Sequence, residues 1–171
     1  MDRRHVLSRS AVAAVGILLL LSFFGSRLRA QETRPAPLIV GSWKLNPAKS
    51  NQRVPPNYVE IRQYILRPDG FLVGLLITGT PQAYHYLQFV ARSDGKDYPE
   101  YSDQIVGDLV ATGKPTSRTY AERTVDDYVT EWIDKVGGRV TAQGKKTVSK
   151  DGMTLTITVD GALAVRVYDR Q

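Results

Sequence analysis

The 171-residue chain contains no cysteine. This absence excludes disulfides, thiol nucleophiles, cysteine-ligated metal centres and lipid attachment at a cysteine behind a signal segment. The fold must therefore be held by its core alone. About 140 residues of compact β structure bury enough surface for that.

Histidine is almost as scarce, and only His85 lies beyond the N-terminal segment. One histidine cannot build a typical zinc site, and a Ser-His-Asp arrangement would depend entirely on it. The sequence also has no Gly-x-Ser-x-Gly turn, no His-Glu-x-x-His pair and no phosphate-binding glycine loop. We expect no catalytic residues, no metal and no cofactor.

The N-terminus has the layout of a secretory signal. The first ten residues carry a basic cluster: Arg3, Arg4 and Arg9. An apolar run from Ala11 to Phe24 follows, and Ala30 ends a stretch suited to signal peptidase. Residues 1–30 are predicted to be a signal helix, and the protein to be exported to the periplasm or the medium. A retained anchor stays open, although the run is shorter than the ~20 residues that span a bilayer. Both the general and the twin-arginine export routes stay open.

The basic character of the chain comes mostly from this segment. Removing residues 1–30 takes five basic residues and one acid, so the net charge falls from +6 to about +2. The densest remaining cluster is Lys145, Lys146 and Lys150, which is typical of a solvated strand edge. We therefore expect no nucleic-acid partner, and contact with a membrane only through the signal before cleavage. The oligomeric state stays open.

Beyond a flexible lead at residues 31–37, residues 38–171 alternate between apolar and polar positions in short segments separated by turn residues. Asp-Gly pairs between such segments are strong hairpin signals. Nine strands are predicted: Leu38–Leu45, Tyr58–Leu66, Phe71–Thr78, Tyr84–Arg92, Ser117–Arg123, Asp127–Asp134, Arg139–Ser149, Met153–Val159 and Leu163–Asp169. Consecutive hairpins favour an all-β antiparallel meander closed into a barrel of about 8–10 strands, with an open sandwich as the alternative.

The acidic stretch around Asp94 is the one candidate for a cation site. Asp94, Asp97, Glu100 and Asp103 are spaced three apart. This spacing is not that of an EF-hand, and acidic residues near a reversal usually form turns. We interpret them as turn formers.

Aromatic residues in the strands carry the strongest hint of a ligand. Inside a barrel they could line a pocket for an apolar or planar small molecule, and outside they would cover the sheet. Alternation does not decide which face points inward, although Tyr84 and Tyr86 must face away from His85 in a regular strand. The candidate ligand-binding residues are Tyr64, Tyr84, His85, Tyr86, Phe89 and Trp132.

Three sequence blocks resemble a family of small secreted bacterial lipocalin-like proteins, which is largely uncharacterised. They are Gly41–Ser50, with its Gly-x-Trp-x-Leu-Asn-x-x-Lys-Ser pattern, Ser93–Pro99, with Asp-Gly-Lys-Asp-Tyr-Pro, and Val148–Thr156 together with Val167–Gln171. The resemblance implies a lipocalin-like barrel in which Gly41 and Trp43 are structural. It also implies an arginine near the end of the last strand that packs over Trp43, and either Arg166 or Arg170 could be that residue.

Three function classes follow. The first is an exported lipocalin-like protein that binds a small, apolar ligand in the barrel. The second is a cell-envelope structural or interaction module whose barrel is packed solid, as small barrels often are. The third is an enzyme that uses His85 with a nearby acid.

Overall fold

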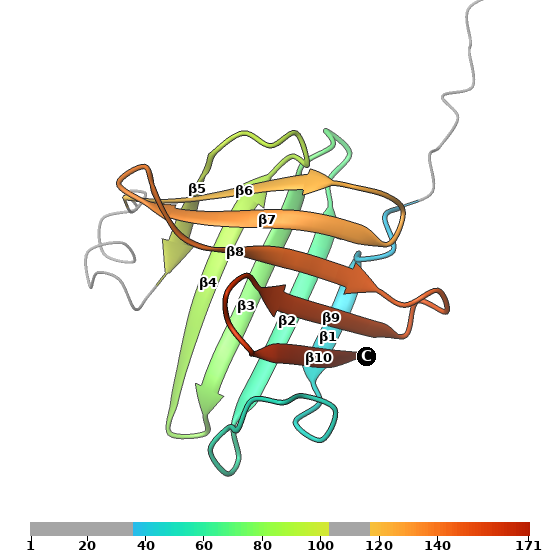
Figure 1. The fold of residues 1–171 in the computed structure, drawn as a ribbon, viewed down its shortest axis with the longest axis vertical. Coiled ribbons are helices and arrows are strands. Elements are labelled where there is room, and N and C mark those ends of the chain that lie inside the picture. Colours follow the sequence, from blue (N-terminus) through green and yellow to red (C-terminus); the bar gives the residue numbers. More distant parts are fainter. Residues whose placement is uncertain (1–35, 103–116) are drawn as a thin grey trace, which may run out of the picture. The chain divides into compact units, whose positions relative to one another are not determined.

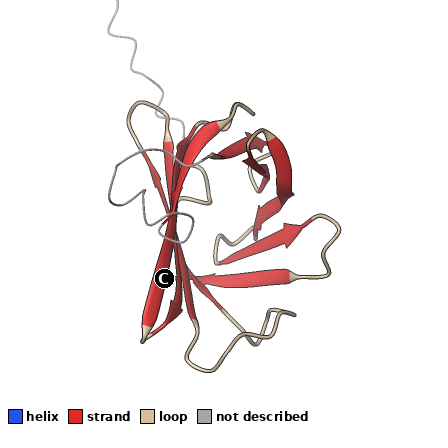
Figure 2. Ribbon diagram, turned by 90° about the vertical axis from the view of Figure 1, so that its left-hand side faces the viewer, coloured by secondary structure: helices blue, strands red, loops and turns tan. Residues whose placement is uncertain are grey.

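The computed structural model describes residues 36–102 and 117–171, and these form ten β-strands (Figure 1). Their bounds are β1 Gly41–Leu45, β2 Val59–Leu66, β3 Leu72–Thr80, β4 Ala83–Ala91, β5 Tyr98–Ser102, β6 Arg118–Thr124, β7 Val129–Val136, β8 Arg139–Val148, β9 Thr154–Val159 and β10 Val165–Arg170. The described residues contain no helix, and so none that could cross a membrane (Figure 2). The predicted signal helix, most of the lead and Asp103 lie outside the described residues.

The strands form one closed barrel in which every strand pairs antiparallel with its neighbours in sequence. The ring closes where β1 pairs with β10, with Trp43 opposite Arg170 and Leu45 opposite Tyr168. Figure 1 shows β6 to β10 crossing in front of β2 to β4 at a steep angle. Closure leaves no free sheet edge among these strands. The predicted all-β class, meander order and closed barrel are therefore confirmed, and the open sandwich is wrong.

Strand β5 is the element that the sequence pattern did not predict. Its pairs place Phe89 opposite Glu100 and Tyr98 opposite Tyr120, so the segment bridges β4 and β6. Pro99 and the acidic residues resemble turn chemistry, but Glu100 is buried in the barrel. The interpretation of Glu100 as a turn former is therefore wrong, whereas Asp94 does form a turn by accepting a hydrogen bond from the Lys96 amide at 3.1 Å.

On β2 the face that points into the barrel is not the apolar face that a simple hydrophobic pattern would select. Its polar face points into the barrel, where Glu60 and Tyr64 are buried, while Ile65 on the apolar face is half exposed. Alternation along a strand then sends Val59 and Ile61 outward as well. This arrangement is possible only because the inward polar groups find partners on distant strands, since an unpaired buried charge is costly.

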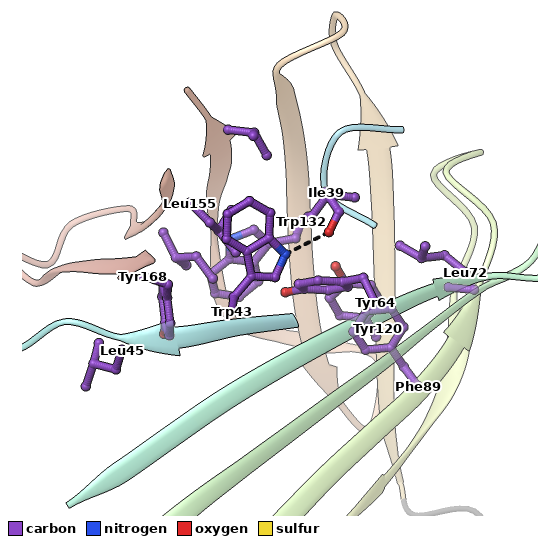
Figure 3. Packing of buried hydrophobic residues seen from close by; sticks show 13 residues of the cluster. Ile39, Trp43, Leu45, Tyr64, Leu72, Phe89, Tyr120, Trp132, Leu155 and Tyr168 are labelled. Atoms are coloured by element: carbon purple, nitrogen blue, oxygen red, sulfur yellow. Dashed lines mark hydrogen bonds between the residues drawn. The ribbon is translucent and has the colours of Figure 1, made fainter. Parts of the chain in front are cut away.

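The core takes side chains from strands around the whole barrel, and Trp43 on β1 is one of its members (Figure 3). Trp43 is fully buried, and its indole Nε1 donates to the Ile39 carbonyl at 2.8 Å. The Arg170 guanidinium lies 4.2 Å from the Trp43 ring, a cation–π contact. Gly41 has φ +139°, and a Cβ there would lie 2.5 Å from that guanidinium. The position therefore needs glycine. We call Ile39, Gly41, Trp43 and Arg170 the closure cluster.

The Asn-x-x-Lys-Ser part of the opening motif also has a structural role at the β1–β10 seam. Asn46 donates to the Asp169 carboxylate at 2.7 Å, and Lys49 donates to the same carboxylate at 2.7 Å. The Ser50 hydroxyl donates to the Asn46 carbonyl and accepts from the Val167 amide. The motif thus fastens the end of β1 to β10.

Candidate ligand-binding site

The barrel contains a cavity of about 300 Å³. Its apolar wall includes Leu76, Leu87, Phe89, Trp132, Ile157 and Val159. Its polar wall includes Gln52, Arg62, Glu100, Asp134, Lys146 and Arg166. This volume lies at the lower end of the range for small-molecule pockets, and the mixture of apolar surface with a few polar groups is typical of them.

Two of the cavity cations are held by one buried carboxylate, Glu60. Its oxygens accept hydrogen bonds from Arg166 at 2.9 and 3.0 Å, from Arg62 at 3.2 Å and from the Tyr168 hydroxyl at 2.5 Å. Burial by itself would raise the pKa of Glu60, but the two guanidinium groups and the tyrosine hydroxyls outweigh it and hold the pKa below its usual value. Glu60 is therefore ionised, and Arg62 and Arg166 share its single negative charge.

The third cation, Lys146, is buried with only 3% of its surface exposed. Its ammonium donates to the Tyr120 hydroxyl and to Glu122 at 3.2 Å. It also lies 4.8 to 5.2 Å from three aromatic ring centroids, those of Tyr64, Phe89 and Tyr120. The prediction of a solvated edge is wrong for Lys146, because an ion pair and three ring faces replace its hydration shell.

The aromatic rings at Lys146 depend on a small neighbour. Phe89 and Tyr120 stack with ring centroids 3.8 Å apart. Gly74 pairs across the strands with Phe89, and a Cβ at Gly74 would lie 2.2 Å from the Phe89 ring. Glycine at this position lets the ring lie against the sheet and form part of the cavity wall.

A pair of acids forms another part of the wall. Glu100 accepts from Arg118 Nε at 2.6 Å, and Asp134 lies 3.8 Å from the same guanidinium. Burial, together with the neighbouring Asp134, raises the pKa of Glu100 to about 7 against the opposing pull of Arg118. Burial also raises the pKa of Asp134. Two carboxyl groups this close, with a single cation, favour holding a proton between them.

Trp132 contributes an unmatched hydrogen-bond donor to the cavity wall. The residue is 9% exposed and lines the cavity. Its indole Nε1 is buried, and no acceptor among the described residues is within hydrogen-bonding distance. A buried donor without an acceptor costs about 1–3 kcal/mol and calls for a specific explanation.

The predicted ligand-binding residues are divided by the strand faces. Phe89 and Trp132 line the cavity. Tyr64 is buried beside Lys146 and is not part of the lining. Tyr84 and Tyr86 lie on the outward face of β4, and Tyr84 is half exposed. His85 shares the inward face with Phe89 but lies near the strand end, where it is exposed and outside the lining.

The two candidate arginines have different partners. Arg170 lies over Trp43, as the resemblance requires of one of them. Arg166 does not pack over Trp43. It lies four residues earlier on β10, beside the cavity, where it binds Glu60. Alternate polar residues on two strands were the missed signal for the interior charges: Glu60, Arg62 and Tyr64 on β2, and Arg166, Tyr168 and Arg170 on β10.

No protein-family model matches the chain, and no curated protein matches it. Among solved structures, the chain is similar to the crystal structure of a mutant of the fluorescent protein UnaG, with a TM-score of 0.48 and 15% sequence identity over 78% of this chain and 96% of that one. This likeness carries no information about a ligand of the present protein. Membership of the resembled bacterial family stays a prediction.

Proposed function

We propose that this protein is exported and binds a small, mostly apolar molecule inside its barrel. The observation that carries the proposal is the cavity of about 300 Å³, which has apolar side chains on several strands. A ligand that removes ~200 Å² of apolar surface from water gains ~5 kcal/mol before the entropy of association is subtracted.

The alternatives fit the interior less well. A solidly packed barrel, the second function class, predicts an interior without a cavity of this size. The enzyme hypothesis required His85 to face a second polar group inside the cavity, and His85 is exposed outside the lining. We therefore pursue ligand binding.

Binding can be tested with Prodan, a neutral naphthyl ketone whose emission shifts to the blue in apolar surroundings. We expect saturable binding with a blue shift for the wild-type protein. Leu76→Trp fills the cavity and should weaken binding at least about tenfold. The matched control is Leu75→Trp, because Leu75 precedes Leu76 on β3 and faces away from the cavity.

Urea unfolding of both variants checks that each remains folded. No saturable binding to the wild-type protein would contradict the proposal. Equal binding by the two tryptophan variants would place the probe outside the cavity and would contradict it as well.

Export is tested separately by the intact mass of the protein recovered from cells that express the full chain. We expect a chain that begins at Gln31 in the periplasmic or extracellular fraction. A chain that keeps residues 1–30 and fractionates with membranes would contradict signal cleavage and favour an anchor.

A further inference from the structure

The buried indole N–H of Trp132 and the apolar wall around it together specify the class of ligand. We propose that the cavity selects a mostly apolar molecule that carries one hydrogen-bond acceptor, which accepts from Trp132 Nε1. This inference rests on the proposed function and narrows it.

The cations in the wall would ordinarily attract an anion. Lys146 is balanced by Glu122, whereas Arg62 and Arg166 share the one carboxylate of Glu60. Both carboxylates are almost fully buried. The group around Glu60 therefore keeps one positive charge in excess and does not disfavour an anion.

The acids in the wall would ordinarily attract a cation. Glu100 and Asp134 share the cation Arg118. Because the pKa of Glu100 is about 7, this acid is mostly ionised at pH 8 and does not disfavour a cation. Charge in the described wall therefore does not define the ligand, and its apolar surface and hydrogen-bonding groups do.

Hydrogen bonding does distinguish one kind of ligand. Arg62, Arg166 and Lys146 each donate to acceptors within the protein. Trp132 Nε1 is the buried cavity donor for which the described residues supply none. An indole N–H can only donate, so the group that satisfies it must be an acceptor such as a carbonyl or ether oxygen.

The apolar part of the wall determines the chemical character of the rest of the ligand. Leu76, Leu87 and Phe89 lie on two paired strands, and Ile157 and Val159 lie on β9, so apolar surface comes from separate parts of the barrel. A molecule that fits about 300 Å³ and carries more than one strongly polar group would leave its other polar groups against these side chains.

Two probes of nearly equal shape test the inference: 2-acetylnaphthalene carries an acceptor, and 2-ethylnaphthalene carries none. Their affinities are measured at pH 8 by displacement of Prodan from the protein recovered from cells that express the full chain. We expect 2-acetylnaphthalene to bind about fivefold more tightly than 2-ethylnaphthalene, the equivalent of one ordinary hydrogen bond.

Trp132→Phe keeps an aromatic ring and removes the donor. It should abolish the preference for 2-acetylnaphthalene over 2-ethylnaphthalene while leaving the affinity for 2-ethylnaphthalene within about twofold. The wild-type affinities stand as a test even if this variant does not fold.

The outcomes separate the two proposals. If none of the probes, Prodan included, binds the wild-type protein, the proposed function fails. If the probes bind but 2-acetylnaphthalene binds no more tightly than 2-ethylnaphthalene, or if Trp132→Phe keeps the acceptor preference, ligand binding survives and the selection for an acceptor through Trp132 is wrong.

Discussion

The two tryptophans of this barrel have opposite surroundings. The Trp43 indole donates to a backbone carbonyl and carries a guanidinium on its ring, and Arg170 in turn donates to the carbonyls of Leu38, Val40 and Gly152. The Trp132 indole lies against a cavity with its N–H unmatched by any described acceptor. The polar groups of the closure cluster thus find their partners within the protein, whereas the Trp132 indole in the cavity wall has no acceptor among the described residues. This difference separates a structural tryptophan from a candidate recognition residue.

The largest test of this comparison is truncation of each tryptophan. Trp43→Ala should lower the free energy of unfolding by about 3–5 kcal/mol, because it leaves a cavity in a filled region and removes the platform for Arg170. Trp132→Ala should lower the free energy of unfolding by a smaller amount, because that side chain already borders the cavity and its indole N–H makes no hydrogen bond in the described structure. Urea denaturation measures both, and equal losses would remove the proposed distinction.

The second test removes the buried cation from the cavity wall. Lys146→Met should destabilise the protein by about 3 kcal/mol, because Glu122 is left buried without its positive partner. The double variant Lys146→Met/Glu122→Gln should recover part of that loss in urea denaturation. If the single variant is as stable as the wild-type protein, the ion pair does not hold the wall together.

The third test uses pH. The pKa of Glu100 is raised from 4.5 to about 7, by burial first and by Asp134 second, so the folded state binds more protons than the unfolded state between these values. Stability should therefore fall as pH rises from about 4.5 to about 7, by at most about 3 kcal/mol.

Glu100→Gln mimics the protonated acid and should flatten this pH profile. The variant should be more stable than the wild-type protein at pH 8 and show no such gain at pH 4. A wild-type stability that rises through the same interval, with no effect of the substitution, would contradict the account of the acid pair.

The smallest effect is expected at the exposed rim of the seam. Lys49 and Asp169 form an ion pair at 2.7 Å with both side chains well exposed to solvent. Such pairs contribute about 0–1 kcal/mol, so Lys49→Met should change stability by less than about 1 kcal/mol, and less still in high salt. A larger loss would mean that the turn from Asn46 to Ser50 depends on the ion pair as well as on its backbone hydrogen bonds.

Much of the fold could be predicted because alternation and Asp-Gly turns are local signals. Nine of the ten strands follow from them, and a meander needs no long-range information to set its strand order. Strand β5 escaped because Pro99 and the neighbouring acids resemble a turn, and only pairing with β4 and β6 makes Glu100 an interior residue.

The site was harder to predict because its logic depends on distant pairs. Glu60 can face inward because Arg166, 106 residues away in the sequence, pairs with it. Lys146 can face inward because Glu122 and three aromatic rings surround its ammonium group. No local pattern contains such partners. Phe89 and Trp132 were among the candidates only because they are aromatic, whereas Tyr84 and Tyr86 share that property and lie on the outer face.

The central claim is that the region around Trp132 admits a ligand while the region around Trp43 is complete. The chain has two tryptophans, so a ¹H–¹⁵N spectrum shows two indole N–H signals, assigned with Trp132→Phe. On titration with 2-acetylnaphthalene, the account predicts a saturable downfield shift of the Trp132 indole proton and little change at Trp43. A shift confined to Trp43, or none at either indole at saturating probe, would contradict it.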